Sequence, residues 1–280
     1  MAGTKLEVRK LAGALGAEVR GVNLADYSRE QLAAVREAFL EHLVVVLPDQ
    51  DLTPAQQIAF TAEFGPVEPH PLGTRASREG HPEVLVLENK PGKSGARNDW
   101  WHSDISFGEI PPAVSVLYAL EATESYGDTM FSNMYASYDQ LSDGMKRLLG
   151  PLSAMHDSSK LRDRGNEPGS DARPIDDIPP PVEHPVVRRH PESGRLALYV
   201  NPYFTSHIAG MTREESQPLL QYLHALSTRS ENVFRHRWRS GDVLMWDNRC
   251  AMHYAIYDYT DRQPRLMNRT TAGGDRPLRG

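Results

Sequence analysis

The chain has 280 residues, which suffices for one large domain or two small ones, and its 39% apolar content is typical of a soluble protein with one sizeable core. A net charge of -6 argues against a general nucleic-acid-binding surface. The single cysteine, Cys250, excludes an internal disulfide and a zinc site built on paired cysteines. The N-terminus lacks the apolar core of a signal peptide, and no apolar run is long enough to span a bilayer. We therefore expect a cytoplasmic protein with neither a nucleic-acid nor a membrane partner.

Four helices are predicted from capping residues and apolar periodicity. Ser28 opens a capping box, and a proline follows Thr53 at the first helical position. Thr212 opens a helix that contains Pro218, which disfavours the first half of that helix. The predicted helices cover residues 28–42, 53–64, 135–149 and 212–227.

Short β-rich runs bounded by Gly, Pro and Asn lie between these helices. Many short strands with a few peripheral helices predict one mainly β domain over residues 1–280, a sandwich or jelly roll buttressed from outside. The segment 158–182 is charged and rich in Pro, Gly and Asp, which predicts a lid or mobile loop within that domain. The predicted strands cover residues 43–47, 84–88, 114–119, 196–200, 232–238 and 242–246.

A histidine and a carboxylate stand two residues apart at His102 and Asp104. On an extended strand, such a pair points to one face of the sheet. With one distant histidine the set becomes the facial triad that holds non-haem Fe(II) and leaves three coordination positions open. A His-x-Asp pair occurs often by chance, so alone it is weak evidence for a metal site. The bulky residues Trp101 and Phe107 beside it strengthen the interpretation, because they would keep water away from a reactive metal centre.

Eleven histidines are available for the third ligand, and His253 fits best. It follows two predicted strands and the polar run 246–249, where the chain leaves the sheet. His236 lies between two arginines, which would repel a cation. Three more histidines stand in loop-like, charged or proline-flanked contexts and are expected to be solvated or locally bonded: His156, His184 and His190.

Two arginines, Arg265 and Arg269, stand four residues apart. On a helix this spacing would form a solvated face, whereas on a strand it places both side chains on one face, about 13 Å apart. In the strand interpretation, one guanidinium grips the carboxylate of a co-substrate and the other reaches a second anion. Guanidinium suits this task because it binds a carboxylate or sulfonate through a two-point fork.

The chain from about Leu6 to Leu278 resembles the taurine dioxygenase and 2,4-dichlorophenoxyacetate dioxygenase family of Fe(II)- and 2-oxoglutarate-dependent oxygenases. Four separate sequence blocks match the family pattern in the family's order, and together they identify the family far more specifically than any single block does. The resemblance implies a double-stranded β-helix, a cupin-like jelly roll. The matching blocks are 101–104, 127–129, 246–249 with His253, and 265–269.

The resemblance also implies the site residues. Fe(2+) would be held by His102, Asp104 and His253. Thr129 would donate a hydrogen bond to the remote carboxylate of 2-oxoglutarate, and Arg265 would form a salt bridge with it. With O2 as the second co-substrate, the reaction hydroxylates a small anionic organic substrate and releases succinate and CO2. The substrate-side residues implied are His70, Asn98, Phe204 and Arg269.

Departures from the family pattern leave the substrate open. Gly73 stands where taurine-oxidising members carry a tyrosine, and Leu161 and Arg162 replace an expected Ser-Phe pair. Four substrates therefore stay open: taurine, another alkylsulfonate, an alkyl sulfate and an aryloxyalkanoate. The aryloxyalkanoate is included because blocks 235–238 and 248–250 resemble the aryloxyacetate-oxidising branch. A zinc hydrolase on the same His-Asp-His set and a non-catalytic binding module are the alternatives outside this family. Family members commonly form dimers or tetramers, so we expect a homo-oligomer.

Overall fold

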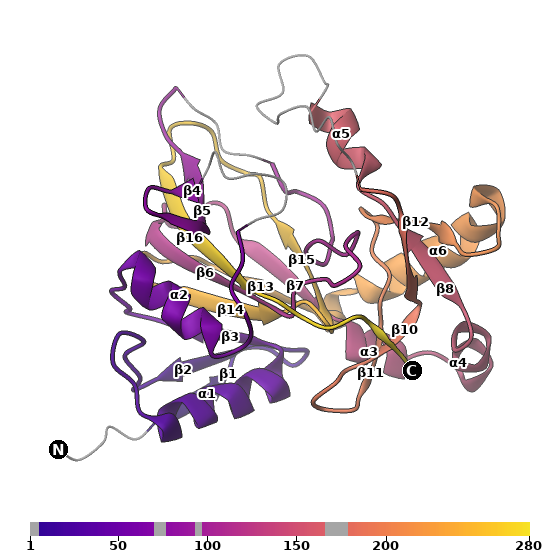
Figure 1. Cartoon of the computed structure of the whole chain (residues 1–280), viewed down its shortest axis with the longest axis horizontal. Helices are drawn as coiled ribbons and strands as arrows, with labels where there is room; N and C mark the ends of the chain where they lie inside the picture. The colour runs from indigo at the N-terminus through magenta and orange to yellow at the C-terminus, as the bar shows by residue number, and fades with distance from the viewer. Residues whose placement is uncertain (1–5, 70–76, 93–96, 166–178) are drawn as a thin grey trace.

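The computed structural model describes residues 6–69, 77–92, 97–165 and 179–280, and β-sheets form its centre (Figure 1). In the large sheet, all neighbouring strands run antiparallel except β2 and β3. The predicted fold class, mainly β with peripheral helices, is confirmed. In spatial order the strands of this sheet are β1 (Glu7–Lys10), β2 (Ala17–Arg20), β3 (Val44–Leu47), β14 (Val243–Asp247), β6 (Val114–Glu121), β16 (Arg265–Ala272), β5 (His81–Asn89) and β4 (Ser77–Arg78).

Three smaller sheets complete the β structure of the described residues. The sheet that contributes to the candidate site consists of β13 (Val233–His236), β7 (Thr129–Asn133) and β15 (Ala251–Ala255). The other two consist of β11 (Leu196–Leu198), β10 (Val187–Arg189) and β17 (Leu278–Arg279), and of β12 (Thr205–Ile208), β8 (Ser153–His156) and β9 (Val182–Pro185).

Alternation of side chains along the central strands divides the core in two. On β14, Leu244 and Trp246 enter one core cluster, whereas Val243 and Met245 enter the other. The first cluster includes Phe131 of β7, so it lies between the large sheet and the β13-β7-β15 sheet. Successive residues of a strand point to opposite faces, which explains why β14 is buried along its whole length.

Helices cover the outer face of the large sheet and the ends of the smaller sheets (Figure 1). Three helices begin with the capping boxes that their sequences predict, at Ser28, Thr53 and Thr212. The last of these continues through Pro218 to its predicted end. These helices are α1 (Arg29–His42), α2 (Pro54–Ala62) and α6 (Arg213–Ser227), and a 3₁₀ turn, η1 (Ser230–Asn232), precedes β13.

Two predictions about helices were wrong. Residues 135–149 form α3 (Met134–Asp139) and α4 (Asp143–Leu149) instead of one helix. The break occurs because the Ser142 hydroxyl accepts a hydrogen bond from the Met145 amide and caps a new helix. The start of the predicted structureless segment is also helical, in α5 (Ser159–Gly165). Residues 166–178 lie outside the described residues, so the lid stays a prediction.

The sequence also misplaced two histidines, because His156 and His184 are buried and not solvated. The expectation of a locally bonded ring is met by His190, whose Nδ1 accepts hydrogen bonds from the backbone amides two and three residues further along the chain. His156 and His184 lie on β8 and β9, which carry them into the protein interior. Their hydrogen bonds reach distant residues: His156 pairs with the Ser106 hydroxyl and His184 with the Gly108 carbonyl. Within the described residues, no helix is both long and apolar enough to cross a bilayer.

Buried neutral histidines predict acid lability. Burial lowers the pKa of His156 to about 3 and that of His224 to about 4. Below pH ~6.5 the unfolded chain therefore binds more protons than the folded protein does. Above that pH these histidines are neutral in both states and do not lower the free energy of unfolding. It should fall towards pH 4 by about 1.4 kcal/mol per pH unit for each such histidine. Urea unfolding across pH 4–7.5 measures this slope.

His224→Leu supplies the control, because Nε2 of His224 is buried without a hydrogen-bond partner among the described residues. The apolar side chain should leave stability at pH 7.5 nearly unchanged and make the pH slope shallower. A variant with the wild-type slope would contradict the assignment of this lability to His224.

Candidate metal centre

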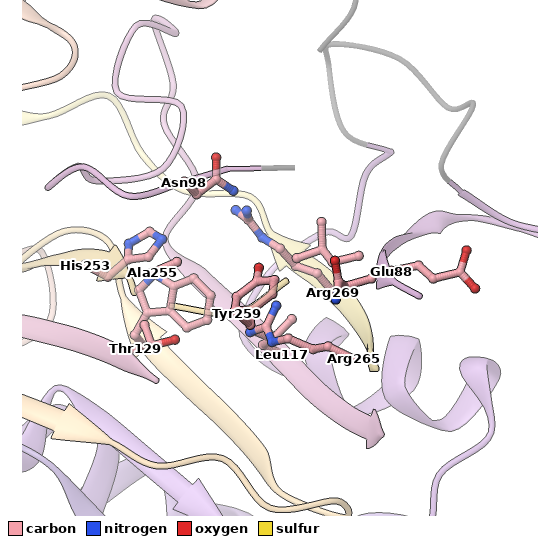
Figure 2. A pocket seen from close by; sticks show the side chains of 12 residues that line it. Glu88, Asn98, Leu117, Thr129, His253, Ala255, Tyr259, Arg265 and Arg269 are labelled. Carbon is pink, nitrogen blue, oxygen red and sulfur yellow. The ribbon is translucent and has the colours of Figure 1, made fainter. Parts of the chain in front are cut away.

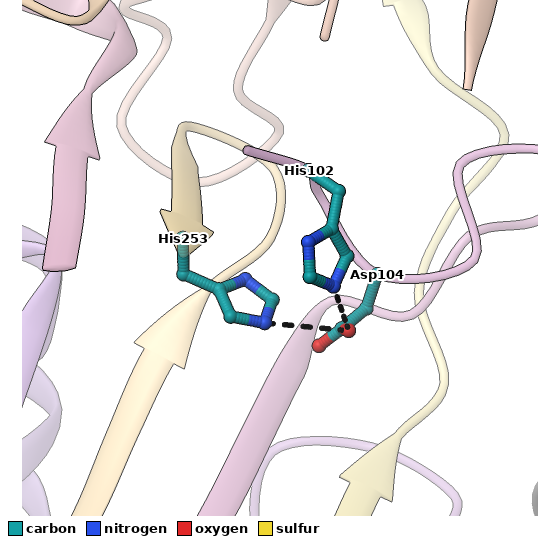
Figure 3. A group of neighbouring side chains, drawn as sticks. All are labelled: His102, Asp104 and His253. Carbon is teal, nitrogen blue, oxygen red and sulfur yellow. Dashed lines mark ion pairs between the residues drawn. The ribbon is translucent and has the colours of Figure 1, made fainter. Parts of the chain in front are cut away.

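A reciprocal pair of backbone hydrogen bonds joins His102 to His253. The His102 amide donates to the His253 carbonyl over 3.0 Å, and the His253 amide donates to the His102 carbonyl over 2.8 Å. This isolated antiparallel bridge brings the two imidazole centroids to 4.1 Å. The extended strand assumed for the His102 and Asp104 pair is absent, because the chain turns after His102 and Ile105 adopts a φ of 47°. The turn still directs Asp104 towards both rings (Figure 3).

The three predicted ligands converge in the interior. Nε2 of His102 and Nε2 of His253 each lie 3.7 Å from Oδ1 of Asp104 (Figure 3). One potential ligand atom from each of the three residues lies within 4.8 Å of the other two, and the residues are 3–7% exposed. Nδ1 of His102 lies 2.9 Å from the Trp100 carbonyl, which can only accept a hydrogen bond. Nδ1 therefore carries the proton, and the Nε2 lone pair faces the other ligands.

The charge state of this cluster suits a divalent cation. Burial lowers the pKa of both imidazoles, so His102 and His253 are neutral. Burial alone would raise the pKa of Asp104, but the Arg269 guanidinium and the hydrogen bond from the Ser115 hydroxyl hold it well below its usual range. Two neutral imidazoles and one carboxylate that converge within 4.8 Å form the donor set of a facial triad, so these residues fit Fe(II).

A second layer of residues fixes the Asp104 carboxylate. The Ser115 hydroxyl donates to Oδ2 over 2.7 Å, and Nη2 of Arg269 lies 2.6 Å from the same oxygen. Asn248 accepts a hydrogen bond from the Asp104 amide over 3.2 Å and donates to the Ser115 hydroxyl over 2.9 Å. Oδ2 is thus fully used by protein groups, which leaves Oδ1 to face the imidazoles.

The residues of the run 246–249 have two roles: some support the candidate site, and others form a structural hydrogen-bond network. Trp246 donates to Asn248 over 3.0 Å, and Asp247 pairs with Arg249 at 2.8 Å and with His190 at 3.0 Å. His190, Asp247 and Cys250 also lie close enough to suggest a metal site. Both His190 nitrogens are already hydrogen-bonded, however, and Arg249 occupies the Asp247 carboxylate. This second cluster is a structural network.

A pocket opens beside His253 and brings several predicted residues together (Figure 2). Both β16 arginines line it, which confirms that Arg265 and Arg269 share one face of a strand. Phe204 does not line this pocket, and its ring centroid lies 5.9 Å from that of His102. His70 and Gly73 lie outside the described residues. The lining residues are Leu87, Glu88, Asn89, Asn98, Leu117, Thr129, Trp246, His253, Ala255, Tyr259, Arg265 and Arg269.

One end of the pocket has the chemistry of an anion site. Arg265 forms no ion pair with a carboxylate of the described residues, and its Nε is buried without a partner. Burial lowers the pKa of Arg265, yet an arginine stays charged, so an anionic ligand would satisfy it. Thr129, which lines the same pocket, is buried at the start of β7. Gly127 adopts a φ of 67°, and a Cβ there would lie 3.2 Å from the Tyr259 ring.

Sequence reasoning missed three residues of this site: Ser115, Asn248 and Tyr259. Asn248 lies in a block that the family resemblance already picked out, and this was the signal that could have identified it. Ser115 stands on a buried strand without any motif, and Tyr259 stands in a loop.

Metal binding should depend on the triad alone. His253→Ala removes one imidazole, and the variant should bind Co(II) at least tenfold more weakly than the wild type. His42→Ala, at the end of α1, is the matched control and should bind Co(II) like the wild type. Calorimetry and visible absorption measure the two affinities, and equal binding by wild type and His253→Ala would contradict the site.

Comparison with known proteins agrees with this geometry. The family described as "Taurine catabolism dioxygenase TauD, TfdA family" matches residues 7–271. The alpha-ketoglutarate-dependent sulfate ester dioxygenase of Pseudomonas putida is 35% identical over 98% of this chain and 91% of that protein. The alpha-ketoglutarate-dependent 2,4-dichlorophenoxyacetate dioxygenase of Cupriavidus pinatubonensis is 35% identical over 88% of this chain and 92% of that protein.

A solved structure shares the fold. The crystal structure of a taurine dioxygenase from Burkholderia xenovorans has a TM-score of 0.83 and 33% identity, and the match covers 98% of this chain and 92% of that one. This agreement confirms the predicted jelly roll, and the family match extends over nearly the whole chain. The chain belongs to the taurine catabolism dioxygenase TauD, TfdA family and is therefore a dioxygenase.

Proposed function

We propose that this protein is an Fe(II)- and 2-oxoglutarate-dependent dioxygenase that hydroxylates a small organosulfur anion, an alkyl sulfate ester or an alkylsulfonate. One observation carries the proposal. A buried His-Asp-His triad lies beside a pocket that its His253 lines together with the two arginines of β16. A zinc hydrolase or a binding module would have no task for this second set of groups.

The triad and the Arg265 end of the pocket have complementary tasks. His102, Asp104 and His253 would hold Fe(II), and Thr129 and Arg265 would bind the remote carboxylate of 2-oxoglutarate. When bound, Fe(II) would couple the reduction of O2 to two oxidations, the decarboxylation of 2-oxoglutarate to succinate and CO2 and the hydroxylation of the substrate. The apolar side chains that line the pocket, Leu87, Leu117 and Ala255, keep water from the reacting groups.

Arg269 supports an anionic head group on the substrate. Nη2 of Arg269 holds Asp104, while Nε has no partner among the described residues, so the guanidinium can serve a second anion. Asn98, on the same pocket, adds an amide. Hydroxylation at the carbon next to the sulfate oxygen or sulfonate sulfur gives an unstable product. That product collapses to an aldehyde and releases sulfate or sulfite.

Two expectations about assembly and location stay predictions. The homo-oligomer, a dimer or tetramer, and the cytoplasmic location follow from the family and the sequence. Size-exclusion chromatography with light scattering would measure the oligomeric state.

The two arginines should separate substrate binding from co-substrate binding. Arg269→Ala should raise the KM of the organic substrate more than tenfold and leave the Kd of 2-oxoglutarate, measured without substrate, near the wild-type value. Arg265→Ala should do the opposite. Steady-state kinetics and calorimetry supply these constants, and equal losses of both ligands in both variants would contradict the division of labour.

The product should identify the substrate class. Succinate release is followed for alkyl sulfates, alkylsulfonates including taurine, and aryloxyalkanoates, with sulfate, sulfite and phenol measured in parallel. We expect the fastest succinate release to be coupled to sulfate or sulfite. Coupling to phenol would favour the second candidate, an aryloxyalkanoate dioxygenase, which the Cupriavidus relative supports. No acceleration by any of these anions would contradict both.

A further inference from the structure

We propose that Trp238 is a positioning residue for 2-oxoglutarate, because its indole N–H fixes the direction in which the Thr129 hydroxyl donates. The inference rests on the proposed function. Trp238 does not itself line the pocket, so it acts on the co-substrate through Thr129.

The hydrogen-bond chemistry of the pair sets the direction. Nε1 of Trp238 lies 3.0 Å from Oγ1 of Thr129, and the two residues are 2% and 4% exposed. An indole N–H can only donate, so the Thr129 oxygen must accept in this contact. The hydroxyl makes no other hydrogen bond to the residues that the structure describes. Its own proton is therefore free to be donated to an anion in the pocket, and the carboxylate of 2-oxoglutarate is the anion that this end would take.

Trp238 also contacts the second group of the anion site. Cζ of Arg265 lies 6.0 Å from the centroid of the indole, within the range of a cation–π contact. One side chain therefore touches both groups that would hold the remote carboxylate. The indole N–H donates a hydrogen bond to Thr129, and the ring contacts the Arg265 guanidinium.

The indole is itself held in place from behind. The His236 ring meets it edge-on, with centroids 4.7 Å apart and an angle of 88° between the planes. Nε2 of His236 is hydrogen-bonded to Asp242 over 3.1 Å, and His236 is the cross-strand partner of Thr129 between β13 and β7. The histidine that sequence reasoning weighed as a metal ligand thus belongs to the support of the anion site.

The test uses Trp238→Phe, which keeps an aromatic ring and removes the N–H. In the Fe(II)-loaded protein without oxygen, calorimetry should show 2-oxoglutarate binding weakened about three- to tenfold, the range expected for one hydrogen bond. The control ligand is 2-oxopentanoate, which has the same chain length and lacks the remote carboxylate. Its Kd should not change. Equal weakening of both ligands would show a merely structural role and overturn the proposal.

A double-mutant cycle tests whether Trp238 acts through Thr129. In a Thr129→Val background the hydroxyl is absent, so Trp238→Phe should no longer weaken 2-oxoglutarate binding. Additive losses would overturn the proposal while leaving the proposed function intact. A wild-type protein that binds 2-oxoglutarate no better than 2-oxopentanoate would instead overturn the proposed function together with this inference.

A second measurement covers the case in which Trp238→Phe does not fold. The chain has four tryptophans, so the Zn(II)-loaded wild type should show four indole N–H resonances in a ¹H–¹⁵N spectrum. Thr129→Val should shift one of these resonances and abolish its response to 2-oxoglutarate. A spectrum in which Thr129→Val shifts none of them would overturn the proposal.

Discussion

The site depends first on the backbone bridge between His102 and His253. Two hydrogen bonds of 3.0 and 2.8 Å tie a segment of loop to the strand β15. Backbone hydrogen bonds fix both position and direction, so the two imidazoles are held close together whatever the rest of the loop does. Asp104 completes the triad because the turn after His102 is short, and Asn248 holds its amide. One pair of backbone contacts thus converts residues distant in sequence into a metal-binding group.

Electrostatics then decide what this group can bind. A buried carboxylate is costly unless charged or polar groups surround it. Asp104 has Arg269 and Ser115 on one oxygen and the two imidazoles on the other. Arg265, at the far end of the same face of β16, lacks such a carboxylate among the described residues. Because side chains alternate along β16, Arg265 and Arg269 lie on the same face of the strand. Arg269 pairs with Asp104 of the triad, whereas Arg265 is available to bind an anionic ligand.

Sequence patterns predicted the parts of this protein that depend on local chemistry. Capping residues located α1, α2 and α6, and the triad and both arginines followed from short motifs. Other features depend on packing between distant elements. Ser142 interrupts a continuous apolar pattern with a cap, and strand pairing buries His156 and His184. The Trp238 contact with Thr129 arises only because β13 pairs with β7, and no motif encodes a strand register.

The central claim is that one centre binds both the metal and the 2-oxo acid, with Arg265 and Thr129 holding the far end of that acid. Visible absorption of the protein with Fe(II) and 2-oxoglutarate in the absence of oxygen tests it most directly. The account predicts a weak charge-transfer band that appears only when protein, Fe(II) and 2-oxoglutarate are all present. A protein that binds Fe(II) at His102, Asp104 and His253 but shows no such band with saturating 2-oxoglutarate would contradict it.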